Sequence, residues 1–497
     1  MAKVSKKKLK TLSGDTVTVD IVDEMYVDGR FVSTDETIPS VHPPTGEQLA
    51  SIPVAMESHV DDAVAAAKAA SDAWQDQSLH DRRETMDRFA DLIESHSEAV
   101  AMLDVTDNGS VLDHFRNEVS DAVEFIRHMS GLATRLSGDV HDMEAGMLDY
   151  EIREPYGAVG SIVPFNHPAM LSLEKVASVL MAGNGLVLKP DERTSLSALY
   201  IAKLIDDADL FPDGLVNVVS GGGDIGGYLS SHPDVGVVTF TGSVQTGRKV
   251  MHAAAENFAE VHLELGGKNP SIVFPDADIK AAAAGTTDGM NLTIGGQSCA
   301  ASTFALVHED VYEPYLTAIE ENFSAIDAGD PLEEGTAMGS LISDNQLTTV
   351  HEYVQSAVEN GATVVTGGSP SPAFESGHYF EPTVLEVDPT MRVAREEIFG
   401  PVLVMTSWSD YDHMIRTVND LDYGLTGSIW TSDLDTAHRT AERVESGYIW
   451  INQHGDLYTG TPFGGFKNSG IGSNGVLDEL RMYTRVKNVN VALDDRT

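Results

Sequence analysis

The hydrophobic pattern of this chain alternates between short apolar runs and amphipathic stretches over most of its 497 residues. In the region 157–267 we predict four apolar strands, over 157–165, 185–189, 215–219 and 235–240. Helices are predicted after them, over 172–182, 196–207, 225–232 and 244–256. Apolar strands that alternate with helices are typical of a parallel sheet covered on both faces. Such sheets bind ligands at the carboxyl ends of their strands.

A second α/β pattern follows residue 267, with strands predicted over 304–307, 401–408, 427–430 and 448–452. The segments before residue 157 predict a hairpin over 25–31 and helices over 60–75 and 82–101. Two further strand-like segments, 137–153 and 483–493, fit neither pattern although they lie far apart in the chain. We expect them to form a small projecting sheet that serves subunit contact.

The charge balance is strongly acidic, with 77 acidic and 32 basic residues and a formal net charge of −45. This field disfavours nucleic acid and anionic membranes as partners, and no apolar run reaches the length of a membrane span. The carboxylates are dispersed rather than gathered in a tail, which favours a halophilic protein over an ordinary acidic one.

The first ten residues run against this trend, because five of them are lysines. A basic arm on an acidic body could bind a polyanion or lie on the protein's own surface. We expect a solvated, poorly ordered extension. The lysines are Lys3, Lys6, Lys7, Lys8 and Lys10.

Cys299 is the only cysteine of the chain. It can form no intramolecular disulfide, which fits a reducing compartment and predicts a cytoplasmic location. A lone cysteine is either inert packing or a reactive thiol. The polar, glycine-rich segment 295–298 before it favours the thiol, and Glu264, which opens Glu-Leu-Gly-Gly-Lys, is a candidate partner base.

Two glycine-rich loops compete as a phosphate site. Both 221–226 and 241–247 connect a predicted strand to a predicted helix, and 221–226 also matches G-x-G-x-x-G. That match is weak because glycine is common in this chain and no acidic residue for a ribose stands out after it. A helix N-terminus offers free N–H groups and the positive end of the helix dipole. These features leave both loops open. A resemblance to a known family, carried by the motifs taken together, favours 241–247 as the pyrophosphate site, and 221–226 would then shape the adenine side.

Two polar residues lie near the ends of other strands of the same sheet. Glu192, close after Lys189, could accept hydrogen bonds from the adenosine ribose hydroxyls and would repel a 2′-phosphate, which favours NAD over NADP. The alternative interpretation of residues 189–192 is an exposed loop with ordinary charges. Asn166 carries amide donors that suit a developing oxyanion, although such an asparagine is more often structural.

The sequence contains no His-Glu-x-x-His, cysteine pair or EF-hand loop, so we predict no metal site.

Taken in order, these motifs resemble those of the aldehyde dehydrogenase superfamily, and the resemblance runs from about Met25 to Val491. The matching segments are 164–168, 189–192, 241–247, 264–268, 295–299, 396–401 and 462–470. The resemblance implies an α/β subunit of three parts, in homodimers or homotetramers. These parts would be a Rossmann-like cofactor domain (25–136 plus 154–263), a catalytic domain (264–470) and a bridging β-sheet (137–153 plus 471–497), preceded by an N-terminal extension (1–24).

The resemblance also implies roles. Cys299 would attack an aldehyde, Asn166 and the Cys299 N–H would hold the oxyanion, and oxidation by NAD would leave a thioester that water activated by Glu264 releases as an acid. Lys175 matches a lysine proposed to relay protons. The residues implied in cofactor binding are Pro164, Phe165, Lys189, Glu192, Thr241, Gly242, Ser243, Gly247, Glu397 and Phe399.

Glu264 favours a free acid as product, because CoA-acylating relatives generally lack this glutamate. A CoA-acylating semialdehyde dehydrogenase and a non-catalytic nucleotide-binding relative remain the alternatives. Some positions depart from the family pattern. Glu174 and Leu457 stand where aromatic residues are frequent near the substrate tunnel, and Phe304 stands where many members carry an arginine.

Overall fold

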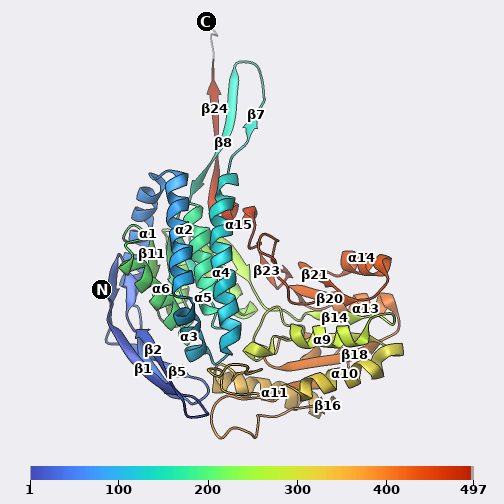
Figure 1. Ribbon diagram of the computed structural model, residues 1–497. Coiled ribbons are helices and arrows are strands. Elements are labelled where there is room, and N and C mark those ends of the chain that lie inside the picture. Colours follow the sequence, from blue (N-terminus) through green and yellow to red (C-terminus); the bar gives the residue numbers. More distant parts are fainter. Residues whose placement is uncertain (1, 494–497) are drawn as a thin grey trace.

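The computed structural model describes residues 2–493, which form two α/β units and a projecting sheet (Figure 1). The first unit contains an eight-stranded sheet of order β23-β13-β12-β9-β10-β11-β3-β4. Its five central strands are parallel, and the strands at both edges are antiparallel. The strands are β3 (Met25–Val27), β4 (Arg30–Val32), β9 (Ala158–Ile162), β10 (Gly185–Lys189), β11 (Val216–Val218), β12 (Val235–Thr241), β13 (Glu260–Glu264) and β23 (Gly470–Ile471).

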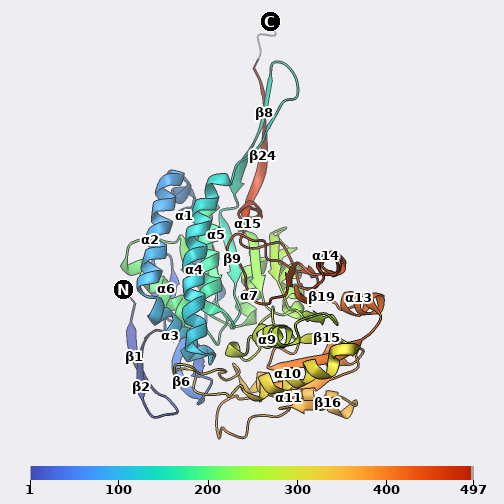
Figure 2. The ribbon, with the colours of Figure 1, turned by 45° about the vertical axis from the view of Figure 1, so that its right-hand side comes forward.

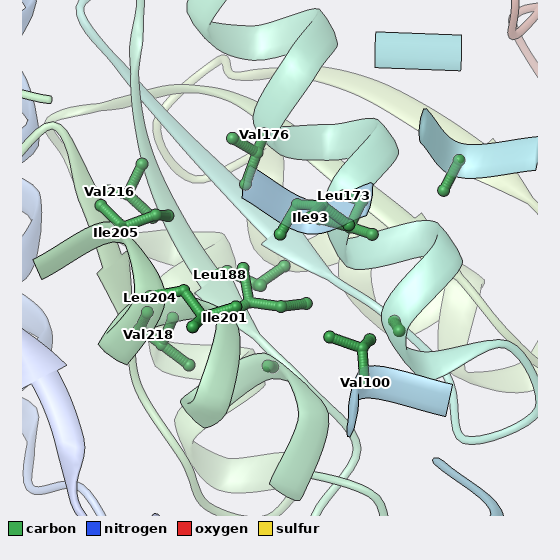
Figure 3. Close-up of a cluster of buried hydrophobic side chains, with 14 of the residues drawn as sticks. Ile93, Val100, Leu173, Val176, Leu188, Ile201, Leu204, Ile205, Val216 and Val218 are labelled. Atoms are coloured by element: carbon green, nitrogen blue, oxygen red, sulfur yellow. The ribbon is translucent and has the colours of Figure 1, made fainter. Parts of the chain in front are cut away.

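Helices cover both faces of this sheet because successive residues of each strand point to opposite sides. Leu186 and Leu188 of β10 join one hydrophobic cluster, and Val187 between them joins another. The first cluster involves α2 (Leu79–Ser95), α3 (Ser97–Asn108), α4 (Leu112–Leu132), α5 (Pro168–Met181) and α6 (Leu196–Asp207). Figure 3 shows Leu188 among side chains of α2, α3, α5 and α6. The second involves α1 (Glu57–Gln75), α7 (Gly223–Ser231) and α8 (Val244–Ala254).

The second unit repeats this architecture with a seven-stranded sheet of order β16-β17-β18-β15-β14-β20-β21. Only the β16–β17 pair is antiparallel. Phe304, which stands where many family members carry an arginine, is fully buried in the hydrophobic core of this unit. The strands are β14 (Pro270–Val273), β15 (Phe304–His308), β16 (Thr363–Thr366), β17 (Thr383–Glu386), β18 (Val402–Trp408), β20 (Thr426–Trp430) and β21 (Tyr448–Ile451). The helices are α9 (Ile279–Gly289), α10 (Tyr312–Ser324), α11 (Asp344–Glu359), α12 (Arg392–Arg395), α13 (Tyr411–Asn419) and α14 (Leu434–Arg443).

A third sheet projects from the body of the molecule, as Figures 1 and 2 show. Its long strands, β8 (Met147–Pro155) and β24 (Thr484–Ala492), pair antiparallel along their whole length, and β7 (Val140–His141) adds a short edge. The pairing expected between these two distant segments is therefore found. Residues 494–497 of the predicted bridging segment lie outside the described residues. The short helix α15 (Leu477–Met482) precedes β24.

The expectation of a poorly ordered N-terminal arm is wrong for the described residues. β1 (Val4–Lys10) forms a hairpin with β2 (Thr16–Val22). Leu9 is completely buried in the large core of the first unit, and the Nζ of Lys7 donates to the carbonyl of Gln48 at 2.7 Å. Alternation puts Leu9 on the core side while its lysine neighbours stay outside.

The single helix expected over 82–101 is also wrong, because α2 and α3 are separate helices that meet at His96. The backbone of His96 leaves helical geometry, and its ring Nδ1 lies 2.9 Å from the carbonyl of Leu92. Such local side-chain bonds compete with the backbone ladder of a helix.

The remaining elements are short. They comprise the hairpin of β5 (Thr37–His42) and β6 (Glu47–Pro53), the pair of β19 (Tyr423–Gly424) and β22 (Phe466–Lys467), and the 3₁₀ turns at Ala133–Arg135, Leu292–Ile294 and Glu309–Val311. Among residues 2–493, no helix combines the length and apolar character needed to cross a membrane.

Candidate active site

A cavity of about 1160 Å³ lies where the two units meet, at the carboxyl ends of the parallel strands of the first sheet. The strand ends contribute Ile162, Lys189 and Thr241, and the second unit contributes Cys299 and Glu397. Ligands of parallel sheets bind at this edge because the loops there vary without disturbing the core. The cavity also reaches α7 and α8 on one face of the sheet and α4 and α5 on the other.

Cys299 lies in a tight loop at the cavity wall. A Cβ added at Gly296 would come within 2.3 Å of the carbonyl oxygen of Gly400, so only glycine fits there. Asn269 donates from Nδ2 to the carbonyl of Cys299 at 2.8 Å and fixes the loop. Burial, followed by the charges of Glu264 and Glu397, raises the pKa of the half-buried thiol to about 12. The thiol is therefore neutral in this state.

Glu264 ends β13, and its surroundings also favour the protonated form. Its side chain is buried and lines the cavity, and neither carboxyl oxygen has a hydrogen-bond partner within the described chain. Burial raises the pKa of Glu264 well above its ordinary value. His262 Nε2 lies 3.8 Å from Glu264 Oε1, and burial lowers the pKa of His262 to about 3. A carboxyl group without partners beside a cavity is suited to accept a proton.

Asn166 lines the same cavity in the loop between β9 and α5, where it is 4 % exposed. Two contacts hold this loop. Asn108 donates from Nδ2 to the carbonyl of Phe165 at 2.6 Å, and Asp104 accepts from the N–H of Ala169 at 3.1 Å. Pro168 begins α5, a position where its missing N–H costs nothing.

Lys175 does not line the cavity. Its Nζ lies behind the wall, 3.2 Å from Glu479 Oε1 and 3.1 Å from Asn474 Oδ1. Burial acts to lower the pKa of Lys175, but the charge of Glu479 outweighs it and the pKa is raised. Asn474 itself lines the cavity and links this buried ion pair to it.

The end of the cavity beside α7 and α8 fits a dinucleotide. Ser243 caps α8 and accepts from the N–H of Thr246 at 3.3 Å, so the N-terminus of this helix faces the cavity. A Cβ added at Gly223 or Gly227 of α7 would meet no atom within 4 Å. These two glycines therefore leave open space for a ligand at this end of the cavity. Thr241, Gly242, Lys189 and Glu192 also line this end, with Lys189 Nζ 3.8 Å from Glu192 Oε2.

Gly247, in contrast, is buried outside the lining. A Cβ there would come within 2.7 Å of the side chain of Leu265. The glycine therefore brings α8 close to the chain that follows β13.

Glu397 and Phe399 join the cavity from the second unit, and Pro164 and Phe165 join it from the first. Glu397 Oε1 accepts from the N–H of Gly267 at 2.9 Å, and burial raises the pKa of Glu397 to about 7. Phe399 has a left-handed backbone (φ 58°), and Gln346 donates to its carbonyl at 2.8 Å. Its ring meets that of Phe165 edge to face, with centroids 5.7 Å apart.

Several residues of the site were not predicted from the sequence. The buried Lys268, whose pKa burial lowers to about 7, is the last residue of the Glu264 motif, and Asn269 directly follows it, so that motif was a signal for both. Glu479 had no signal in the sequence. Glu174 and Leu457 do line the cavity, and burial raises the pKa of Glu174 to about 8.

His114 and Glu118 of α4 meet His167 at the wall of the cavity. Glu118 Oε1 lies 2.6 Å from His114 Nε2 and is hydrogen-bonded to His167 Nδ1. Burial acts to raise the pKa of Glu118, but the charges of His167 and His114 outweigh it and lower the pKa to about 2. No pattern in the sequence indicated this cluster, because His167 is far from α4 in the chain.

Fold and site together define an α/β protein with two large sheets. The cavity between its two units combines a cysteine, a helix N-terminus and a buried carboxyl group that has no hydrogen-bond partner in the described part of the chain. The model of the aldehyde dehydrogenase family matches residues 31–489. The chain therefore belongs to the aldehyde dehydrogenase family.

Named relatives and solved structures agree with this assignment. The chain is 38 % identical over 478 residues to aldehyde dehydrogenase 1 of Tanacetum cinerariifolium, covering 95 % of each chain. It is 35 % identical over 490 residues to hydroxyisobutyraldehyde dehydrogenase of Mycolicibacterium austroafricanum, covering 98 % of this chain and 97 % of the relative. The aldehyde dehydrogenase of Bacillus cereus, solved as a complex with NAD⁺, superposes with a TM-score of 0.92 at 36 % identity, covering 95 % of this chain and 96 % of that one.

Proposed function

We propose that this protein oxidises an aldehyde to its carboxylic acid with NAD. The observation that carries the proposal is that Cys299, Glu264 and Asn166 line one cavity whose other end has the room and the helix N-terminus that a dinucleotide needs. Thr241, Gly242, Ser243, Lys189 and Glu192 would hold the nucleotide, and Glu397 and Phe399 its nicotinamide end.

Oxidation begins at Cys299. The sulfur, once deprotonated, forms a bond to the aldehyde carbon, and the carbonyl oxygen takes up the negative charge. The amide of Asn166 and the backbone N–H of Cys299 donate to this oxyanion. When bound, NAD accepts the two electrons and the hydrogen that leave the aldehyde carbon. A thioester then remains on Cys299.

Hydrolysis depends on Glu264. Its carboxylate takes a proton from water, the resulting hydroxide adds to the thioester carbon, and the C–S bond breaks to release the acid and restore Cys299. The absence of hydrogen-bond partners around Glu264 within residues 2–493 leaves its oxygens free for this water. Lys175 supports proton exchange through Asn474, which joins the buried Lys175–Glu479 pair to the cavity.

The finer properties of the proposal rest on separate observations. Glu192 at the nucleotide end favours NAD over NADP. The single cysteine supports a cytoplasmic location, and the dispersed negative charge supports a halophilic protein. The projecting sheet supports a homodimer or homotetramer.

We also propose the division into a cofactor domain (25–136 plus 154–263), a catalytic domain (264–470) and bridging elements (137–153 plus 471–497). Each of the first two ranges contains most of one large sheet, and β8 and β24 of the bridging elements pair with each other.

The first test is reduced-cofactor formation over a panel of aldehydes in concentrated KCl, with NAD and NADP in parallel. We expect turnover with NAD that disappears in Cys299→Ala, and a free acid as product whether or not CoA is present. A CoA thioester as the main product would instead support an acylating enzyme. A folded protein that binds NAD but oxidises none of the aldehydes would support a non-catalytic relative.

A further inference from the structure

The cluster of His114, Glu118 and His167 has no part in the proposed reaction. It lies at the cavity wall, on the side formed by α4 and the start of α5. Each of the three side chains offers one potential ligand atom, and these atoms lie within 4.8 Å of one another. Sequence patterns alone predicted no metal site, because the third member joins the other two only in the folded chain.

The local geometry brings the three side chains to one point. His114 and Glu118 are four residues apart in α4, so they lie on the same face of the helix. His114 Nε2 approaches Glu118 Oε1 to 2.6 Å but makes no hydrogen bond. His167 Nδ1 reaches the same oxygen from the loop after β9.

Two buried atoms of the cluster lack hydrogen-bond partners in the described part of the chain. Glu118 is 6 % exposed, and its Oε2 has none. His114 Nε2 also has none. The other ring nitrogen of His114, Nδ1, lies 3.1 Å from the hydroxyl of Thr293, which orients the ring with Nε2 toward Glu118. Buried polar atoms are seldom left unpaired, so the free Oε2 of Glu118 indicates a missing ligand, whereas His114 Nε2 keeps an ion-pair contact with Glu118 Oε1 at 2.6 Å.

We propose that His114 Nε2, His167 Nδ1 and the Glu118 carboxylate bind a divalent transition-metal ion of the zinc class. Two imidazole nitrogens and one carboxylate oxygen suit zinc and its neighbours, whereas magnesium and calcium prefer oxygen ligands alone. A metal-binding histidine usually has its second nitrogen hydrogen-bonded, as Thr293 does for His114. Three protein ligands leave a fourth position of a tetrahedral ion for water or a substrate oxygen.

The surrounding charge favours a cation at this place. Asp121, Glu124 and Glu174 line the same side of the cavity, from α4 and α5. No hydrogen bond or ion pair within residues 2–493 ties down the carboxyl groups of Asp121 and Glu174, and Glu118 adds a third carboxyl group on this side of the cavity. A concave surface of one sign of charge concentrates counter-ions.

The test is a calorimetric titration of the chelator-treated full-length protein with Zn²⁺, together with the visible absorption spectrum of bound Co²⁺. Both are made on Cys299→Ala, because a cysteine thiolate is itself a zinc ligand. We expect one ion per chain. Removing a ligand in His114→Ala should weaken binding by more than 10-fold. Removing the hydroxyl that contacts His114 Nδ1, in Thr293→Ala, should weaken it by about 10- to 100-fold.

The matched control is His80→Ala. His80 and Glu84 are also a histidine and a glutamate four residues apart on a helix, but they are exposed and 3.9 Å apart. We expect His80→Ala, made in the Cys299→Ala background, to bind the ion with the same affinity as Cys299→Ala alone. Glu118→Gln serves as a second ligand variant if it folds, as judged by its unfolding temperature. Absence of saturable binding to Cys299→Ala, or equal affinity in His114→Ala and His80→Ala, would overturn the proposal.

Discussion

At the scale of single residues, burial favours the protonated forms of both groups at the reaction centre. Burial raises the pKa of Cys299 to about 12 and the pKa of Glu264 well above its usual range. Each carboxylate near Cys299 adds to the cost of forming the thiolate, and Glu397 is one of them. Proton release therefore controls both the attack on the aldehyde and the hydrolysis of the thioester.

Turnover should accordingly rise with pH across the neutral range. Glu264 holds its proton below its raised pKa, and only the ionised form accepts a proton from water, so the active fraction grows as pH increases. Glu264→Gln should lower steady-state turnover by roughly 100- to 10,000-fold while a single burst of reduced cofactor remains. Rapid-mixing fluorescence of the reduced cofactor measures both phases.

The control for this prediction is Glu260→Gln, an exposed change on the same strand. It should keep the turnover of the parent. If Glu264→Gln hydrolysed the thioester at the parental rate, Glu264 would not be the base.

Glu192 should set the preference between the two cofactors. Its carboxylate lines the nucleotide end of the cavity and is partly exposed. Removing its charge in Glu192→Gln should raise kcat/KM for NADP relative to NAD by about 10-fold, since repulsion of a 2′-phosphate near a protein surface is on the order of 1–4 kcal/mol. Exposed Glu256→Gln is the comparison variant. An unchanged ratio in Glu192→Gln would remove Glu192 from cofactor selection.

At the scale of elements, the N-terminal hairpin is part of the core rather than an appendage. Leu9 of β1 is completely buried together with Val19 and Ile21 of β2. Leu9→Ala should therefore lower the free energy of unfolding by roughly 2–5 kcal/mol. Lys8→Ala, an exposed neighbour, should change it by about 0.5 kcal/mol or less. Denaturant titration followed by tryptophan fluorescence compares the two, and equal small effects would mean that the hairpin contributes little.

The projecting sheet should hold subunits together. Ile152 of β8 and Val486 of β24 are 38 % and 49 % exposed on strands that extend away from the body (Figure 2). Exposed apolar side chains on such an extension are typical of an interface. Replacing both with glutamate should reduce the molar mass measured by light scattering, whereas Phe258→Glu, at an apolar residue 94 % exposed elsewhere, should not. A double variant with the parental mass would exclude this sheet as the contact.

At the scale of the whole molecule, the net charge of −45 should make stability depend on salt. Repulsion among dispersed carboxylates destabilises the compact state, and 1 M salt shortens its range to about 3 Å. We expect the unfolding temperature and the turnover to rise together with KCl concentration. Glycerol at equal osmolality, which does not screen charge, should fail to replace KCl. Full stability and activity at low ionic strength would contradict a halophilic protein.

Regular elements with clear sequence boundaries were predictable. The strand over 185–189 and the helix over 196–207 occur as predicted, because an apolar run or an amphipathic period is itself the local cause of such an element. Short strands such as β13 and β17 were missed, since so few residues carry no distinct period. The lysine-rich strand β1 was missed because its one buried leucine is a weak signal beside five lysines.

The sequence by itself determined the family, the reactive cysteine and the order of the motifs, because these depend on which residues occur and at what spacing. Only the tertiary structure decided the rest. It buries Glu264 with no hydrogen-bond partner among residues 2–493 and pairs Lys175 with Glu479. It also brings His167 to the helix that carries His114 and Glu118. Proton affinity and ligand geometry depend on burial and on distances between segments that are remote in the chain, and packing of the two sheets sets both.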